Sequence, residues 1–135
     1  KQRIKNAIKM RPWSGPFKTL CWKIGDCIVK HNTPFYNNVF KERKAFEIQQ
    51  NENLAYYDQA MKKARQVGSS TTAYKYYAIG KLPPDHINNR AMRYTVKIFL
   101  AHWHEEIWKH EFGTKPPNPY ALEQLGHIHK IECPV

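Results

Sequence analysis

Histidine and glutamate residues gather in the sequence HWHEEIWKH, which spans residues 102–110. His102, Glu106 and His110 recur every four residues, so a helix would place all three on one face. Zinc sites need three or four converging ligands, and the HExxH pattern has a second histidine four residues after the first. Trp108 stands four residues after His104, so this pattern is broken. We therefore expect a solvated polar face that holds no metal and no cofactor in this chain.

A second group of ligand types lies in the C-terminal sequence LGHIHKIECP. His127, His129 and Cys133 could complete a metal site only if this segment folded back onto residues 102–110. A metal-dependent hydrolase therefore stays as an alternative, and its ligands would include His102, His104 and His110.

Ser14 and Gly15 form a Ser-Gly pair in the sequence RPWSGPFK, residues 11–18. A nucleophilic serine needs a base, or an arginine cluster that stabilises the transferring phosphate. Arg3 and Arg11 lie near it in sequence, but no Asp-His pair at a recognisable spacing accompanies them. Serine is also among the strongest helix N-caps, and Pro16 suits a first helical turn. We interpret Ser14 chiefly as an N-cap and keep it as the candidate catalytic residue.

Tyrosines and a lysine adjoin one another in YKYY, residues 74–77. Aromatic rings can stack on unpaired bases while neighbouring cations follow the phosphates. The nearby basic residues are Lys62, Lys63, Arg65 and Lys81. The same tyrosines could pack against a core instead, and the sequence favours neither interpretation.

Charge is the most informative bulk property. The 22 Lys and Arg residues outnumber the 11 Asp and Glu residues, which gives a formal net charge of +11. Residues 1–30 contain eight basic residues and a single acid, Asp26. Such asymmetry favours DNA or RNA as the partner, because each cation placed at a phosphate releases counterions. The predicted contacts are Lys1, Arg3, Lys5, Lys9, Arg11, Lys18 and Lys23, with Arg90, Arg93 and Lys97 as a second basic surface. A charge that serves only solubility is the alternative.

Apolar runs and cysteines indicate the cellular compartment of the chain. No apolar run approaches the roughly 18 to 20 residues that span a bilayer, and no secretory signal is visible. Cys21, Cys27 and Cys133 are an odd number at no metal-ligand spacing. We expect a cytoplasmic chain with no membrane partner.

Apolar spacing of three and four residues predicts helices along the chain. The first helix follows Ser14, ends near residues 31–32, and has a stripe made of Phe17, Leu20, Cys21, Ile24, Cys27 and Ile28. The second has Thr33 as its N-cap and extends toward Gln66, with the polar sequence QQNEN at 49–53 as a candidate break. Its expected buried residues are Phe35, Val39, Phe40, Phe46, Leu54, Tyr57, Met61 and Ala64.

Two more helices are expected in the second half of the chain. Thr71 or Thr72 caps a short helix that ends at Gly80, and Asp85 caps the longest helix, which Gly113 terminates. The core stripe of the longest helix should be Met92, Val96, Phe99, Trp103 and Ile107.

The absence of period-two alternation leaves an all-α fold, a compact bundle of about four to five helices. We divide the chain into a basic N-terminal segment at 1–13, a helical domain at 14–113, and a proline-rich tail at 114–135 with one turn of helix at 120–125. A chain of this length fits one domain, or one piece of a longer protein.

Two segments in order resemble a known family. They are RPWSGPFKTLCWKIGDCIVKHNTPFYNNVFKERKAFE at 11–47 and LPPDHINNRAMRYTVKIFLAHWHEEIW at 82–108. Their order and residue types resemble the C-terminal domain of the DEDD insertion-sequence transposases, which include the RNA-guided bridge recombinases. Residues 17–29, 35–44 and 91–108 match pieces of that domain.

The resemblance implies DNA strand exchange. In that family a RuvC-like N-terminal domain supplies acidic metal ligands, and the C-terminal domain supplies a serine in a Ser-Gly context, which here would be Ser14. This chain has no RuvC-like part, so it would be a transposase or recombinase fragment without the metal-binding half. We expect a nucleic-acid-binding helical domain that can form homo-oligomers. The alternative is a non-enzymatic helical module for protein interaction or oligomerisation.

Overall fold

The computed structural model describes residues 13–118, 123–126 and 130–134. Five helices form within these ranges: α2 (Gly15–Lys30), α3 (Pro34–Glu52), α4 (Tyr57–Ala64), α5 (Thr72–Ala78) and α6 (Pro84–Phe112). The same ranges contain no strand. The all-α prediction is therefore confirmed. The helical turn expected at 120–125 falls partly outside the described residues.

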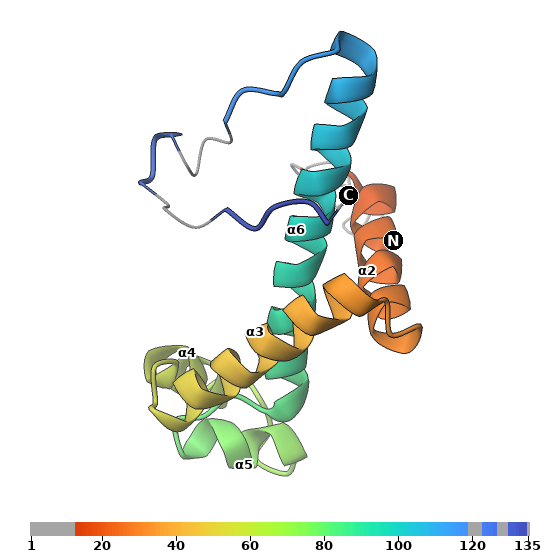
Figure 1. Cartoon of the computed structure of the whole chain (residues 1–135). Helices are drawn as coiled ribbons and strands as arrows, with labels where there is room; N and C mark the ends of the chain where they lie inside the picture. Colours follow the sequence, from red (N-terminus) through yellow and green to blue (C-terminus); the bar gives the residue numbers. More distant parts are fainter. Residues whose placement is uncertain (1–12, 119–122, 127–129, 135) are drawn as a thin grey trace.

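Helix α6 is the axis on which the other elements are arranged (Figure 1). It has 29 residues, and α3 crosses it in the most extensive helix–helix contact of the described chain. α2 packs along the middle of α6. α4 and α5 pack on each other at the end of the molecule where α3 ends and α6 begins (Figure 1).

Local sequence determines most helix ends as predicted. The hydroxyls of Ser14 and Thr71 each accept a hydrogen bond from the amide three residues later, at 3.3 and 3.2 Å. Gly80 and Gly113 follow the ends of α5 and α6 with left-handed backbones, at φ of +77° and +65°. Glycine adopts this conformation without the steric cost of a Cβ atom.

The start of α6 differs from the prediction by two residues. Pro83 occupies the N-cap position, Pro84 is the first helical residue, and Asp85 lies within the first turn instead of capping the helix. Proline is favoured there because it has no amide hydrogen to leave unpaired. Asp85 still places a negative charge near the positive end of the helix dipole.

The second helix is broken at the candidate polar sequence, residues 49–53, and does not extend unbroken toward Gln66. α3 ends at Glu52, and α4 begins at Tyr57. Leu54 lies between them with a left-handed backbone, φ +56°, and its amide bonds to the Asn51 carbonyl at 3.2 Å. The chain thereby turns so that α4 can pack beside α5.

The buried face of α3 is partly polar, which the sequence analysis did not predict. Asn37, Glu47 and Asn51 are buried, whereas Phe46, Leu54 and Tyr57, three of the expected core residues of this region, are exposed. The Asn51 amide group donates to the Leu82 carbonyl at 3.0 Å and accepts from its amide at 2.8 Å. These two bonds fasten the end of α3 to the turn before α6.

Glu47 is the most deeply buried charged residue described, with 1% of its surface exposed. Its carboxylate accepts hydrogen bonds from Arg43 at 2.7 Å, from Arg90 of α6 at 2.6 Å, and from the Tyr56 hydroxyl at 2.5 Å. The Arg90 guanidinium also stacks on the Tyr56 ring, 4.2 Å from its centroid. Burial raises the pKa of Glu47, but the three donors outweigh burial and hold the pKa below its ordinary value.

The buried face of α6 also differs from the predicted stripe. Trp103 and Ile107 are exposed, and Met92 and Phe99 are half-buried, whereas Thr95, His102 and Glu105 are buried. Each buried polar residue has a partner. The Thr95 hydroxyl donates to the Ala91 carbonyl at 3.0 Å, for example, and this removes the cost of burying it.

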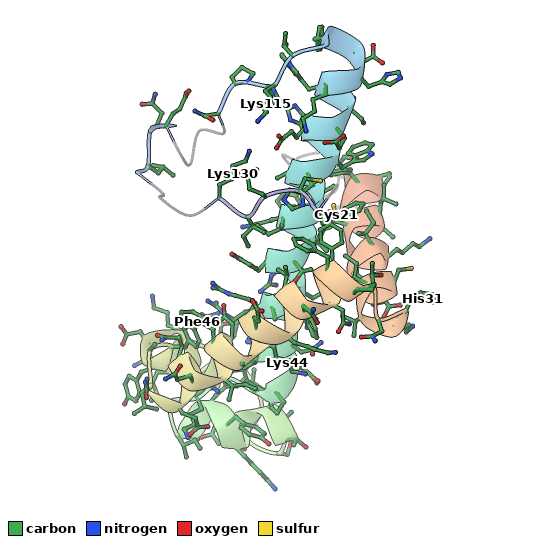
Figure 2. The ribbon with its side chains drawn as sticks, viewed as in Figure 1. Cys21, His31, Lys44, Phe46, Lys115 and Lys130 are labelled. Atoms are coloured by element: carbon green, nitrogen blue, oxygen red, sulfur yellow. The ribbon has the colours of Figure 1, made fainter. Side chains whose placement is uncertain are left out.

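Residues 130–134 of the C-terminal tail lie against α6. His102 donates from Nε2 to the Ile131 carbonyl at 2.6 Å, because a carbonyl can only accept, and in the neutral ring Nδ1 then accepts from the Tyr36 hydroxyl at 3.0 Å. Lys130, labelled in Figure 2, forms an ion pair with Glu105 at 3.2 Å. His102 thus joins α3, α6 and the tail, which explains why it is buried.

Replacing Glu47 by Gln should lower the free energy of unfolding by about 3 kcal/mol at pH 7, because it leaves two arginines without their shared carboxylate. The pKa of Glu47 is below its ordinary value of 4.5. Its contribution is therefore complete above that value and is lost as the pH falls through the lower, folded-state pKa. Urea unfolding of the parent chain and the variant, at pH 7 and at a series of lower pH values, measures both the loss of stability and its pH dependence.

Glu52→Gln is the matched control for this variant. Glu52 is exposed and pairs with Lys81 at the surface, so its loss should cost less than about 1 kcal/mol. Equal stability of the Glu47→Gln variant and the parent chain at pH 7 would contradict the role given to Glu47.

Candidate nucleic-acid interface

Close packing of α2 against α6 shapes the surface that carries the exposed cations. Gly25 faces Met92 and Val96, and a Cβ atom added to Gly25 would lie 2.6 Å from the Met92 Cγ. A residue larger than glycine here would require the Met92 side chain to shift. The two helices therefore approach closely, and a groove lies beside this contact.

This groove has a volume of about 410 Å³ and lies between α2 and α6. Its apolar lining comes from Cys21 and Trp22 on α2 and from Met92, Val96 and Leu100 on α6. Figure 2 shows Cys21 where these two helices face each other. The polar lining consists of Lys18, Asn89, Arg93 and Lys97. None of the described side chains that line the groove is acidic.

A second hollow continues this surface toward the start of α2. It is lined by Trp13, Gly15, Lys18, Thr19 and Trp22, so it shares Lys18 and Trp22 with the groove. The Lys18 ammonium lies 5.7 Å from the Trp13 ring centroid, within cation–π range. Trp13 and Trp22 are 52% and 57% exposed. The surface therefore presents two exposed indole rings and a cation that line one hollow.

The cations of the groove differ from Arg90 in what they contact. Lys18, Arg93 and Lys97 are exposed, and none forms an ion pair with another described residue. Arg90 was predicted to share a second basic surface with Arg93 and Lys97, but its guanidinium pairs with Glu47 and stacks on the Tyr56 ring. Three of the predicted cations therefore line one groove, whereas Arg90 stabilises the contact between α3 and α6.

The other predicted phosphate contacts lie elsewhere. Lys23 is exposed on α2 and does not line the groove. The five cations of the basic N-terminal segment fall outside the described residues: Lys1, Arg3, Lys5, Lys9 and Arg11.

Ser14 acts as the N-cap of α2 and is exposed. Its neighbours Trp13 and Gly15 line the hollow at the start of α2. The hydroxyl accepts the Phe17 amide, and the hydrogen bonds described for it include no histidine or carboxylate that could act as a base. Its local geometry is therefore that of a cap.

The histidine face of α6 does not assemble as a ligand set. His102 is buried against Tyr36 and Ile131, His110 is 86% exposed, and Glu106 pairs with Lys109. The expectation that this whole face is solvated is therefore wrong for His102. Within the described ranges, no three His, Cys, Asp or Glu residues are placed to hold a metal ion. His127 and His129 lie outside those ranges.

The YKYY segment forms part of α5 and is divided between core and surface. Tyr77 is buried with Ala60, Leu82 and Ile87, while Tyr76 is partly exposed. Lys81 pairs with Glu52. Core packing therefore accounts for at least one of these tyrosines.

Two features of the groove were not predicted from the sequence, namely Trp22 and Asn89. Asn89, Arg93 and Lys97 are four residues apart, so they lie on one face of α6. That spacing was visible in the sequence. The position of Trp22 opposite this face depends on the packing of α2, which sequence spacing alone does not specify.

Comparisons with known proteins add no family to this description. Neither the models of protein families, nor the curated proteins, nor the solved structures contain a match to this chain. None of the described helices has an apolar stretch long enough to cross a bilayer.

Replacing Ser14 by Ala should lower the free energy of unfolding by about 1 kcal/mol, the usual cost of losing a serine cap. Thermal or urea unfolding measures this directly. Ser14→Asp should restore stability, because aspartate caps helices equally well. An alanine variant as stable as the parent would show that the cap contributes nothing.

Proposed function

We propose that this chain is a nucleic-acid-binding helical domain whose groove between α2 and α6 contacts the phosphates of DNA or RNA. One observation carries the proposal: Lys18, Arg93 and Lys97 come from two helices and meet around a groove without acidic lining. Phosphates arriving there would displace counterions and gain affinity that falls with salt.

The overall charge supports this assignment. The chain carries a formal charge of +11. Asp26, the one acidic residue of α2, forms an ion pair with Lys30 at 2.7 Å. Long-range attraction would therefore bring a polyanion toward α2 and the middle of α6.

We further propose that the domain is the C-terminal part of a DEDD-type transposase or recombinase. The support is the resemblance in the order of residues 11–47 and 82–108, the two segments that form α2, most of α3 and most of α6. In such a protein the groove would hold a nucleic-acid strand, and Ser14, beside Trp13, would lie next to it.

A second candidate function is a helical module for protein interaction or oligomerisation. It is favoured by large apolar side chains that are exposed on α2 and on the second half of α6, namely Phe17, Leu20, Trp103, Ile107 and Phe112. A stable oligomer in size-exclusion chromatography with light scattering, together with weak retention on heparin, would favour this second function.

The triple variant Lys18→Ala/Arg93→Ala/Lys97→Ala should bind DNA more weakly and with less dependence on salt. Losing three phosphate contacts should reduce the slope of log Kd against log salt by about 3 for duplex DNA and about 2 for a single strand. Fluorescence anisotropy with a labelled oligonucleotide over a series of KCl concentrations measures both quantities.

The matched control is Lys62→Ala/Arg65→Ala/Lys75→Ala. It removes the same charge from exposed residues of α4, its C-cap and α5, so it should change the slope much less. Affinity of the parent chain that does not vary with salt would contradict the proposed function, as would equal losses in the two variants.

A further inference from the structure

We propose that the α2–α6 groove binds an unpaired nucleotide, with its base against Trp22 and its phosphates at Lys18, Arg93 and Lys97. This inference rests on the proposed function and narrows the substrate from nucleic acid in general to a single strand.

The lining of the groove indicates more than a phosphate site. Lysines on an open helix surface suffice to bind a phosphate backbone, and such contacts need no apolar floor. Here the groove is also lined by the apolar side chains of Met92, Val96 and Leu100 on α6 and by Trp22 on α2. A volume of about 410 Å³ falls in the range of sites that bury a small molecule. The occupant should therefore have a flat apolar part and an anionic part close together, as a nucleotide does.

The exposure of the indole rings indicates that the base is unpaired. The faces of bases in a duplex are covered by their neighbours, so a protein ring can stack on a base only where the strand is single or the base is turned out. Trp22 is 57% exposed, although indole is among the largest apolar side chains. Stacking on a base would cover that surface.

The second ring extends the site along a strand. Trp13 lines the hollow at the start of α2 together with Lys18 and Trp22, and the Lys18 ammonium is 5.7 Å from the Trp13 ring centroid. Two rings and a cation at one hollow can contact the bases and the phosphate of successive nucleotides. Sequence-tolerant stacking with cations along the backbone is the usual way in which proteins bind single strands.

The test compares a fluorescein-labelled oligothymidylate with the same strand annealed to oligodeoxyadenylate, by anisotropy at low salt with the full chain. The parent chain should bind the single strand more tightly than the duplex. Trp22→Ala should weaken single-strand binding about tenfold and duplex binding much less. Trp22→Phe, which keeps an aromatic face, should recover most of the lost affinity.

Phe112→Ala is the control variant, since Phe112 is an exposed aromatic residue at the end of α6 and lies about 18 Å along the helix from Leu100. Its binding should equal that of the parent. Circular dichroism checks that each variant keeps its helices.

The outcomes separate this inference from the function on which it rests. Salt-dependent binding with equal affinity for strand and duplex, unchanged in Trp22→Ala, would overturn the single-strand site and leave nucleic-acid binding intact. No binding to either DNA would overturn both. Polyglutamate that competes as well as the oligothymidylate, and loses affinity in Trp22→Ala, would assign the groove to acidic peptides and overturn the inference.

Discussion

The buried carboxylate of Glu47 is the interaction on which the arrangement of helices depends. It takes hydrogen bonds from Arg43 on its own helix, from Arg90 on α6 and from Tyr56 before α4. A buried charge is costly unless every acceptor site is matched by a donor, so the crossing of α3 over α6 can vary little. The position of α2 depends on that crossing, because the side-chain amide of Asn37 on α3 donates a hydrogen bond to the Ile28 carbonyl near the end of α2, at 3.3 Å. The groove between α2 and α6 is the result.

Arg90 and Arg93 lie on the same helix, but one stabilises the fold and the other is available at the surface. They are three residues apart, yet Arg90 is held between Glu47 and the Tyr56 ring, and Arg93 lines the groove. A count of basic residues treats them alike. Their roles differ because Glu47 forms an ion pair with Arg90 and not with Arg93. The charge available to a partner on this face is therefore smaller than the sequence suggests.

The sequence predicted helix type and helix ends better than it predicted helix faces. Ser14, Thr71, Gly80 and Gly113 act through neighbours within a few residues, so local chemistry was sufficient. The buried faces of α3 and α6 contain Glu47, Asn51 and His102, and their burial is possible only because partners arrive from Arg90, Leu82 and Ile131. Those separations range from 29 to 43 residues. The same reason explains what was missed in the groove. Its cations were predicted from the sequence, but Trp22 was not, because its position depends on how α2 packs on α6.

The central claim is that nucleic acid lies between α2 and α6. Photocross-linking with an oligonucleotide that carries 4-thiothymidine, followed by mass spectrometry of the cross-linked peptides, tests it most directly. We expect cross-links in the peptides that contain Trp13, Trp22 and residues 89–100. Cross-links confined to α4 and α5, where Lys62 and Lys75 are also exposed, would contradict the account.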